Sequence, residues 1–321
     1  MAENLLEIKN LKKYFSTPRG ELHAVDNVTL NIEKGKTIGV VGESGCGKST
    51  LGKTLMRLYT PTAGEILYNG KDIAGMPIRE FKKNYRTNIQ MIFQDPYASL
   101  DPRMNVLQLI EEPIKVNNKK MPKKEVEERA KEMMELVGLA KRLENTYPHE
   151  LDGGRRQRIG IARALSLNPD FIVCDEPVSA LDVSIQAQIL NLLQDLQDER
   201  GLTYMFITHD MSVVKHISDD IAVMYLGQLI EKCPASEIFK NTIHPYSQAL
   251  LSAIPIPNVH IKKERMILKG ELTSPIDPKP CCRFAARCPY ATEECLAKEP
   301  ELREIKPNHH VACHYAEKFV K

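Results

Sequence analysis

The amino-acid sequence predicts an α/β fold, in which strands and helices alternate around a central sheet. Two apolar strands carry this prediction: residues 37–41 run into a glycine-rich loop and a helix, and residues 171–174 end at two carboxylates. A helix over residues 184–197 and a third apolar strand over residues 203–208 follow in the same alternating order. Short continuous apolar runs of this kind are typical of buried strands.

The remaining elements give weaker patterns that fit the same fold. Val28, Leu30 and Ile32 alternate with polar neighbours, as in a half-buried strand. The first helix is expected to begin near Ser49, and further strands are expected at residues 64–68 and 89–93. A helical pattern covers residues 104–142. No internal repeat is visible in the sequence.

The composition is that of an ordinary globular protein, with 42% hydrophobic and 27% charged residues among 321. The net charge of +2 gives no basic footprint of the kind that nucleic-acid-binding proteins carry. No apolar run approaches the roughly 18 residues that a membrane helix needs, and the polar start of the chain has no apolar signal core. We therefore expect a cytoplasmic protein that serves any membrane process through partners.

The composition changes near Ile254, where prolines begin to interrupt any long element. We place a domain boundary there, with one domain over residues 1–255 and a small proline- and cysteine-rich C-terminal domain over residues 256–321. Most of the eight cysteines lie in this tail, and in a cytoplasmic protein such a cluster favours a metal over disulfides. A tail this short would bury little core unaided.

Residues 42–49 match the phosphate-loop pattern G-x-x-x-x-G-K-[ST], between a strand and a helix as the pattern requires. Glycines let consecutive backbone N–H groups curl around a phosphate, and the helix N-terminus adds partial positive charge. Lys48 is expected to reach the β- and γ-phosphates of ATP, and the Ser49 hydroxyl to bind Mg²⁺. A plain glycine turn would not also carry Lys-Ser at the helix start. The predicted nucleotide-binding residues are Gly42, Ser44, Gly45, Cys46, Gly47, Lys48, Ser49 and Thr50.

Asp175 and Glu176 follow the strand at residues 171–174. Asp175 is expected to hold Mg²⁺, and Glu176 to polarise the attacking water. Alone, two carboxylates after an apolar strand could equally be a solvated strand end. Behind a phosphate loop, they indicate an enzyme that hydrolyses ATP.

Four further motifs appear in a fixed order: Gln94 after a strand, residues 151–158 before a helix, residues 179–182 after the carboxylates, and His209 after the next strand. In this order they resemble the Q-loop, signature, D-loop and H-loop of ATP-binding cassette (ABC) transporter ATPases. The resemblance covers about residues 5–255.

A narrower resemblance is carried by residues 42–52, 93–100 and 244–251, which look like the ATP-binding subunits of dipeptide and oligopeptide importers. The proline-rich tail with its cysteines is similar to theirs as well.

The resemblance implies a fold and a set of roles. The fold is a P-loop NTPase of the ABC type: a central mixed sheet with helices, an antiparallel β subdomain, and a helical subdomain at about residues 95–168. Phe15, with Tyr14 beside it, would stack on adenine, and the two adjacent aromatic residues compete for this role. Gln94 would sense Mg²⁺ and the γ-phosphate, and His209 would contact the γ-phosphate. Without the other motifs, His209 would be taken for an ordinary loop histidine.

The resemblance also implies partners. The chain would be one of two ATPase subunits, in a homodimer or a heterodimer, peripheral to the cytoplasmic face of the membrane. Two membrane permease subunits would bind it, one of them near residues 95–103, and a solute-binding protein would act indirectly.

The function implied is ATP hydrolysis that powers uptake of dipeptides or oligopeptides, with nickel or oligosaccharides left open as substrates. One rival is a soluble ABC ATPase acting on nucleic acid, which the single phosphate loop and the short insert after Gln94 disfavour. The other rival is a binding module that keeps ATP as a structural ligand.

The signature departs from the family's usual L-S-G-G-Q: Asp152 replaces the serine and Arg155 the glutamine, while Gly153 and Gly154 are kept. In the family, the signature of one subunit caps the γ-phosphate held by the other, and an ionised carboxylate there cannot donate a hydrogen bond. We expect Asp152 to weaken the site that contains the partner's phosphate loop. Arg155 and Arg156 could offset part of this by pairing with Asp152 or with phosphate.

Cys282, Cys288, Cys295 and Cys313 are four potential thiolate ligands, which suit either Zn²⁺ or an iron–sulfur cluster. Their spacings lack the short pair of most structural zinc sites, yet spacing alone leaves both metals open. The resemblance to importer subunits favours a [4Fe–4S] cluster. It also makes Cys281 a bystander.

Overall fold

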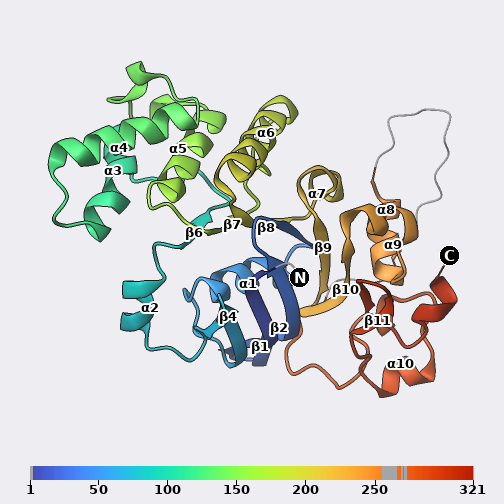
Figure 1. Ribbon diagram of the computed structural model, residues 1–321. Helices are drawn as coiled ribbons and strands as arrows, with labels where there is room; N and C mark the ends of the chain where they lie inside the picture. Colours follow the sequence, from blue (N-terminus) through green and yellow to red (C-terminus); the bar gives the residue numbers. More distant parts are fainter. Residues whose placement is uncertain (1–2, 255–265, 269, 271–272, 321) are drawn as a thin grey trace, which may run out of the picture. The chain divides into compact units, whose positions relative to one another are not determined.

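The computed structural model describes residues 3–254, 266–268, 270 and 273–320 (Figure 1). The chain forms two compact units, one of residues 1–75 with 206–321 and the other of residues 76–205. It leaves the first unit after Gly75 and returns to it within strand β8 (Thr203–Thr208). The N-terminal and C-terminal segments therefore belong to the same unit.

The first unit contains an antiparallel sheet with the strand order β2-β1-β4-β5. Its long ribbon of β1 and β2 is visible in blue in Figure 1. A bulge in β1 accompanies Asn10, whose φ is 48°, so the strand changes which side chains face the core along its length. The strands are β1 (Asn4–Thr17), β2 (Gly20–Glu33), β4 (Ala63–Tyr68) and β5 (Lys71–Asp72).

The same unit also contains strands of a mixed sheet. β3 is parallel to β9, β9 is antiparallel to β10, and the hairpin of β11 and β12 continues the sheet beyond β10. β3 is buried along its whole length, as its apolar sequence predicts. The strands are β3 (Thr37–Val41), β9 (Asp220–Tyr225), β10 (Gln228–Pro234), β11 (Arg303–Lys306) and β12 (His309–Val311).

Helices complete the first unit. Leu51 and Leu55 form the buried side of α1, and His244 caps α9 by accepting a hydrogen bond from the Tyr246 backbone N–H at 3.0 Å. The helices are α1 (Lys48–Leu55), α7 (Met211–Ile217), α8 (Ala235–Asn241), α9 (Pro245–Ser252) and α10 (Glu293–Ala297), with short 3₁₀ turns at Ala285–Arg287 and Ala316–Phe319.

The second unit is mainly helical. Its strands β6 (Ile89–Ile92) and β7 (Phe171–Asp175) pair in parallel. Asn105, Asp152 and Asp182 cap three of its helices through their side chains. The helices are α2 (Ile78–Asn84), α3 (Val106–Asn117), α4 (Lys123–Leu136), α5 (Gly153–Leu165) and α6 (Val183–Arg200), with 3₁₀ turns at Lys141–Leu143 and Pro148–Glu150.

The predicted α/β core with its antiparallel sheet is confirmed. The helical pattern expected at residues 104–142 is confirmed. It is divided into two helices, α3 and α4, because Pro122 precedes the first residue of a new helix. The predicted boundary at residue 256 lies outside the described residues, and it stays a prediction, as does a helical subdomain at residues 95–168.

The described part of the C-terminal tail is not a compact unit of its own, because it belongs to the first unit. β12 pairs with β10, and His309 lies 2.7 Å from Glu231 in a contact that leaves both side chains almost fully buried. The tail thus completes its core by packing on the rest of this unit.

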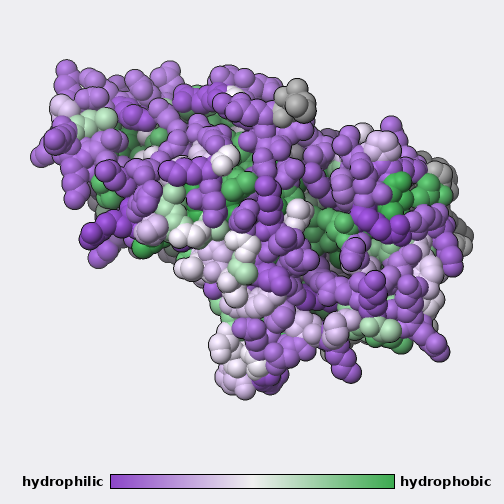
Figure 2. All heavy atoms as spheres, turned by 60° about the horizontal axis from the view of Figure 1, so that its bottom comes forward, coloured by the Kyte–Doolittle hydropathy of each residue, from purple (hydrophilic) through white to green (hydrophobic). Residues whose placement is uncertain are grey.

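None of the described helices combines the length and hydropathy of a membrane-spanning segment. Hydrophilic residues predominate on the face drawn in Figure 2.

Candidate nucleotide-binding site

The glycine-rich loop joins β3 to α1, and two of its glycines are required by the space around them. Gly42 and Gly47 have φ angles of 153° and 107°, which side-chain-bearing residues rarely adopt. Added Cβ atoms would lie 2.2 Å from the Met224 carbonyl oxygen and 2.0 Å from the Ala24 carbonyl oxygen, respectively. The loop backbone is therefore packed directly against β9 and β2.

Lys48 begins α1 and folds back into the loop. Its side chain is buried, and Nζ donates to the carbonyl oxygens of Gly42 at 2.7 Å and Glu43 at 3.0 Å. No acidic residue occurs in the first turn of α1, so the positive end of the helix is not neutralised locally. Ser44 and Gly45 are exposed at the outside of the loop. An exposed glycine-rich loop, a buried lysine and the positive end of a helix together suit a bound phosphate.

Cys46 supports the loop from behind. Its side chain is 1% exposed, and burial raises the pKa of its thiol. Its carbonyl oxygen accepts a hydrogen bond from the Gly227 backbone N–H at 2.8 Å. Ser49 and Thr50 follow in the first turn of α1 with half-buried side chains.

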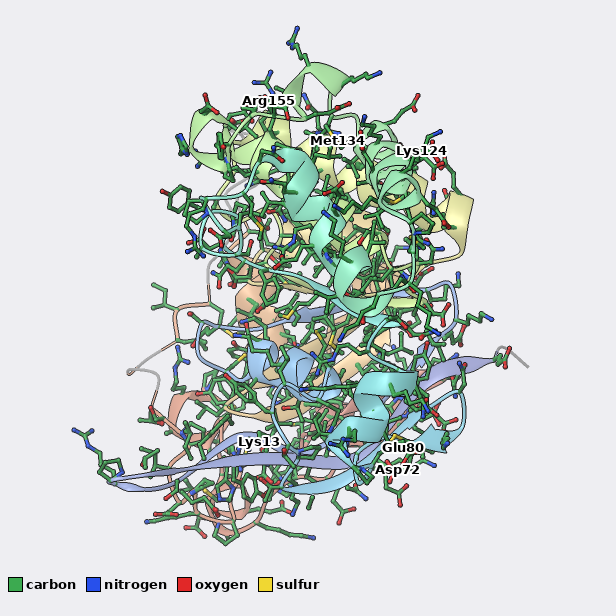
Figure 3. The ribbon with its side chains drawn as sticks, turned by 90° about the vertical axis from the view of Figure 1, so that its left-hand side faces the viewer. Lys13, Asp72, Glu80, Lys124, Met134 and Arg155 are labelled. Carbon is green, nitrogen blue, oxygen red and sulfur yellow. The ribbon has the colours of Figure 1, made fainter. Side chains whose placement is uncertain are left out.

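The two candidate adenine-stacking residues have different neighbours. Tyr14 stacks on His23, with ring centroids 3.8 Å apart and an interplanar angle of 15°. Phe15 makes an edge contact with Tyr59 at 5.3 Å, and the Lys13 ammonium lies 4.6 Å from the Phe15 ring centroid. Figure 3 labels Lys13 on the long strand β1. One face of Tyr14 is thus covered within the protein.

His209 follows β8 and is exposed. The next residue, Asp210, caps α7 by accepting a hydrogen bond from the Ser212 backbone N–H at 2.7 Å. His209 therefore lies at a fixed helix start, and it belongs to the same unit as the phosphate loop.

In the second unit, Asp175 ends β7 with its side chain buried, and Glu176 follows with a φ of 46°. A non-glycine residue in this left-handed region costs about 1–2 kcal/mol, and such strain concentrates at functional sites. The side-chain amide of Gln94 donates to Glu176 Oε2 at 2.9 Å. The structure thus brings together two of the residues that the sequence singled out, from the ends of β6 and β7.

Asp152 is the N-cap of α5. Its Oδ1 accepts a hydrogen bond from the Arg155 backbone N–H at 2.8 Å, and its Oδ2 lies 3.4 Å from Arg155 Nη1. The side chains of both residues are about half exposed, and Arg155 is labelled in Figure 3. The expected pairing of Asp152 with Arg155 is therefore present.

The two signature glycines lie where α5 approaches α6. A Cβ on Gly154 would come within 2.7 Å of the Ile185 side chain, and one on Gly153 within 3.0 Å of the Leu181 side chain. Both positions thus have a packing reason for glycine.

Cys282, Cys288, Cys295 and Cys313 line one cavity in the first unit, with His314 beside them. Burial raises the pKa of the Cys282 thiol to about 12 and also raises those of Cys288 and Cys313. Among the described residues, no three metal-ligating side chains have the arrangement of a metal site. Four thiolates gathered here would repel one another, so the cavity suits either neutral thiols or a cationic group.

Two residues that the sequence analysis did not single out individually contact the phosphate loop. The Tyr246 hydroxyl accepts a hydrogen bond from the Glu43 backbone N–H at 2.9 Å. The Arg287 guanidinium lies 2.8 and 3.1 Å from the two carboxylate oxygens of Glu43. These contacts join positions 203 and 244 residues apart, so no local pattern reveals them.

Comparison with known proteins agrees with the predicted resemblance. Residues 25–179 match the family model for the ABC transporter, and residues 230–295 match the model for the C-terminal region of oligopeptide/dipeptide transporters. The oligopeptide transport ATP-binding protein AppF of Bacillus subtilis is 50% identical over 321 residues, covering 97% of this chain and 97% of that protein. The oligopeptide transport ATP-binding protein OppF of Escherichia coli is 52% identical, covering 96% of this chain and 92% of that protein.

Solved structures give the same assignment. The dimeric ATP-binding cassette MJ0796, in a post-hydrolysis state bound to ADP and Pi, has a TM-score of 0.66 and 31% identity, covering 72% of this chain and 98% of that one. The protein cbiO1 from Clostridium perfringens, part of an ABC transporter complex, has a TM-score of 0.65 and 28% identity, covering 75% of this chain and 93% of that one. The chain therefore belongs to the ABC transporter family, as an ATP-binding cassette related over nearly its whole length to oligopeptide transport ATP-binding proteins.

Proposed function

We propose that this chain hydrolyses ATP to drive the uptake of dipeptides or oligopeptides across the cytoplasmic membrane. The observation that carries the proposal is an identity of 50% and 52%, over 97% and 96% of the chain, with proteins named as oligopeptide transport ATP-binding proteins. The match of residues 230–295 to the C-terminal region of such transporters supports it. Nothing in these relatives favours an ATPase that acts on nucleic acid.

For ATP, we assign the phosphate loop as the binding element. Lys48 would neutralise the β- and γ-phosphates, because its ammonium group is already held inside the curve of the loop. Phe15 is the better candidate for adenine, because the Tyr14 ring is stacked on His23 and its hydroxyl donates to Asp26. Among the described residues, the Phe15 ring has an edge contact with Tyr59 and only the flexible Lys13 side chain over its face. His209 would contact the γ-phosphate.

For Mg²⁺, the chain offers hard oxygen donors, which this ion prefers. These are the Ser49 hydroxyl, the buried Asp175 carboxylate and the side chain of Gln94. Mg²⁺ would supply charge neutralisation at the phosphates.

Glu176 is assigned as the residue that polarises the attacking water. Its strained backbone and its hydrogen bond from Gln94 fix the carboxylate in one place. Exchanging Glu176 for Gln keeps the size and the hydrogen-bonding shape but removes the base, so turnover should fall by about 100-fold or more. ATP binding should persist, and an ATP-bound dimer should accumulate on size-exclusion chromatography.

The matched control is Glu199→Gln, at the exposed end of α6, which should leave the ATPase rate unchanged. An unchanged rate in Glu176→Gln would show that Glu176 is not the catalytic carboxylate.

A second ATPase subunit would complete the site. In a heterodimer, the Asp152 signature would weaken only the site holding the partner's phosphate loop, while this chain's own loop would be capped by the partner's signature. In a homodimer, both sites would carry Asp152, with Gly153 and Gly154 beside it.

Membrane permease subunits are the proposed partners at the cytoplasmic face, with a solute-binding protein acting through them. A cavity in the second unit supports this, because Phe93, Ser99, Pro113 and Arg163 line it. Tyr97, within residues 95–103, is 54% exposed, and Phe93, just before this segment, is 44% exposed. Phe93→Asp should abolish co-purification with the permeases, and full retention would place their contact elsewhere.

We also propose that Cys282, Cys288, Cys295 and Cys313 hold a [4Fe–4S] cluster, with Zn²⁺ as the alternative. The support is that all four line one cavity. When bound, the cluster would supply the cationic centre that lets buried thiolates coexist. Iron and sulfide analysis with absorbance at roughly 400 nm tests this, and a colourless, zinc-loaded protein would overturn it.

A further inference from the structure

A short segment of the C-terminal tail, residues 283–287, reaches the phosphate loop from outside. Arg287 pairs with Glu43 through two parallel contacts of 2.8 and 3.1 Å. The side chains are only 12% and 27% exposed, so the pair is shielded from water more than a surface ion pair. A bidentate guanidinium–carboxylate pair of this kind is strong and fixes the geometry of both partners.

Phe284 anchors the segment. Its side chain is 2% exposed and packs edge-on against Tyr225 at 5.3 Å and Tyr246 at 5.5 Å. Tyr246 in turn uses its hydroxyl to accept the Glu43 backbone N–H. The tail therefore holds Glu43 both by its side chain and, through this aromatic cluster, by its backbone.

Arg283 provides a second support. It pairs with Asp26 of β2 and donates to the Leu226 carbonyl oxygen. The next residue, Gly227, donates to the Cys46 carbonyl oxygen at 2.8 Å, within the phosphate loop. Arg283 thus fixes the turn on which the loop rests.

The negative charge of Glu43 lies in the loop that would bind the triphosphate, and the Arg287 guanidinium pairs with it. A carboxylate inside a loop that binds a triphosphate would repel it, since like charges a few ångströms apart interact by about 1 kcal/mol or more. The ion pair with Arg287 offsets the charge of Glu43.

We propose that the C-terminal tail is part of the nucleotide site: Arg287 is a positioning residue that neutralises Glu43 and holds the phosphate loop ready for ATP. Phe284 and Arg283 keep the segment in place. The inference rests on the proposed binding of ATP at this loop.

The test compares MgATP affinity by calorimetry across variants of the full chain, with catalysis blocked in all by Glu176→Gln. Arg287→Met should weaken ATP binding by about tenfold, because Glu43 is left charged beside the phosphates. Glu43→Gln should bind at least as tightly as the parent, and the double variant Glu43→Gln/Arg287→Met should return to near the parent affinity. A residue that only stabilised the fold would not be rescued by neutralising Glu43.

The matched control is Arg303→Met, which breaks another arginine–glutamate pair of the tail, that with Glu317, and should leave ATP affinity unchanged. Parent-like affinity in Arg287→Met, or no rescue in the double variant, would overturn the inference. If Arg287→Met does not fold, weaker binding in Glu43→Gln alone would overturn it. Absence of ATP binding in the parent would instead refute the proposed function.

Discussion

Asp152 offers a sharp test, because its structural role and its proposed effect on hydrolysis respond differently to substitution. In the structure it caps α5 through a 2.8 Å hydrogen bond to the Arg155 backbone N–H, and it pairs with the Arg155 guanidinium at 3.4 Å. The cap contributes about 1 kcal/mol, and serine caps as well as aspartate. The exposed ion pair contributes at most about 1 kcal/mol.

Asp152→Ser should therefore lower the free energy of unfolding by no more than about 1 kcal/mol, and shift Tm by only a few degrees. At the opposing phosphate loop, however, it replaces a repelling carboxylate by a hydroxyl that can donate. Recovering one hydrogen bond to a charged group, at about 1.5–3 kcal/mol, should raise ATPase turnover about tenfold or more.

The assay is steady-state ATPase of the isolated chain beside Asp152→Ser, Asp152→Asn and Asp152→Ala. Asp152→Asn removes the charge without supplying the hydroxyl. Its turnover should therefore lie between that of the wild type and that of Asp152→Ser. Asp152→Ala loses the cap and should unfold at a lower temperature than Asp152→Ser. Equal turnover in the wild type and Asp152→Ser would refute the idea that Asp152 impairs hydrolysis.

Two other predictions follow from single buried contacts. Gly47→Ala places a Cβ 2.0 Å from the Ala24 carbonyl oxygen, at a φ of 107°, so ATP binding should be lost and Tm should fall. The control is Gly70→Ala, whose Cβ would meet open space at a φ of 74°. It should lower Tm without loss of ATP binding. Burial lowers the pKa of His244 in the folded state to about 4. Below about pH 6.5 the unfolded state therefore binds more protons than the folded state. The free energy of unfolding should fall by about 2 kcal/mol between pH 8 and pH 5. In His244→Asn, which keeps a capping side chain that does not titrate, Tm should depend less on pH over this range; an identical pH profile would contradict the assignment.

The sequence predicts those parts of the fold whose pattern is local. Strands such as β3 and β7 are uninterrupted apolar runs, and the phosphate loop is set by its own glycines and Lys48. β1 was missed because the bulge at Asn10 breaks its alternation. The break between α3 and α4 could have been read from Pro122, since proline favours a helix start.

In the candidate site, too, the sequence predicts the residues that belong to a local motif but not the contacts between distant residues. The sequence singles out Gln94 and Glu176 for separate roles, and only the structure shows the hydrogen bond between them. The salt bridge of Arg287 with Glu43 could not be predicted, because neither residue has a local signature that links it to the other. Ion pairs across 244 residues depend on how the sheet assembles, and composition does not encode this.

The separation of Glu43 and Arg287 has a consequence for biosynthesis. The proposed nucleotide-binding loop, with Glu43, is made early, and Arg287, which would neutralise Glu43, is translated 244 residues later. At roughly 5–20 residues per second, this interval lasts about 10 to 50 seconds. A chain that ends between Glu176 and Arg287 would keep Lys48 and Glu176, but Glu43 would have no arginine partner. On this proposal, such a chain would bind ATP about tenfold more weakly than the full chain.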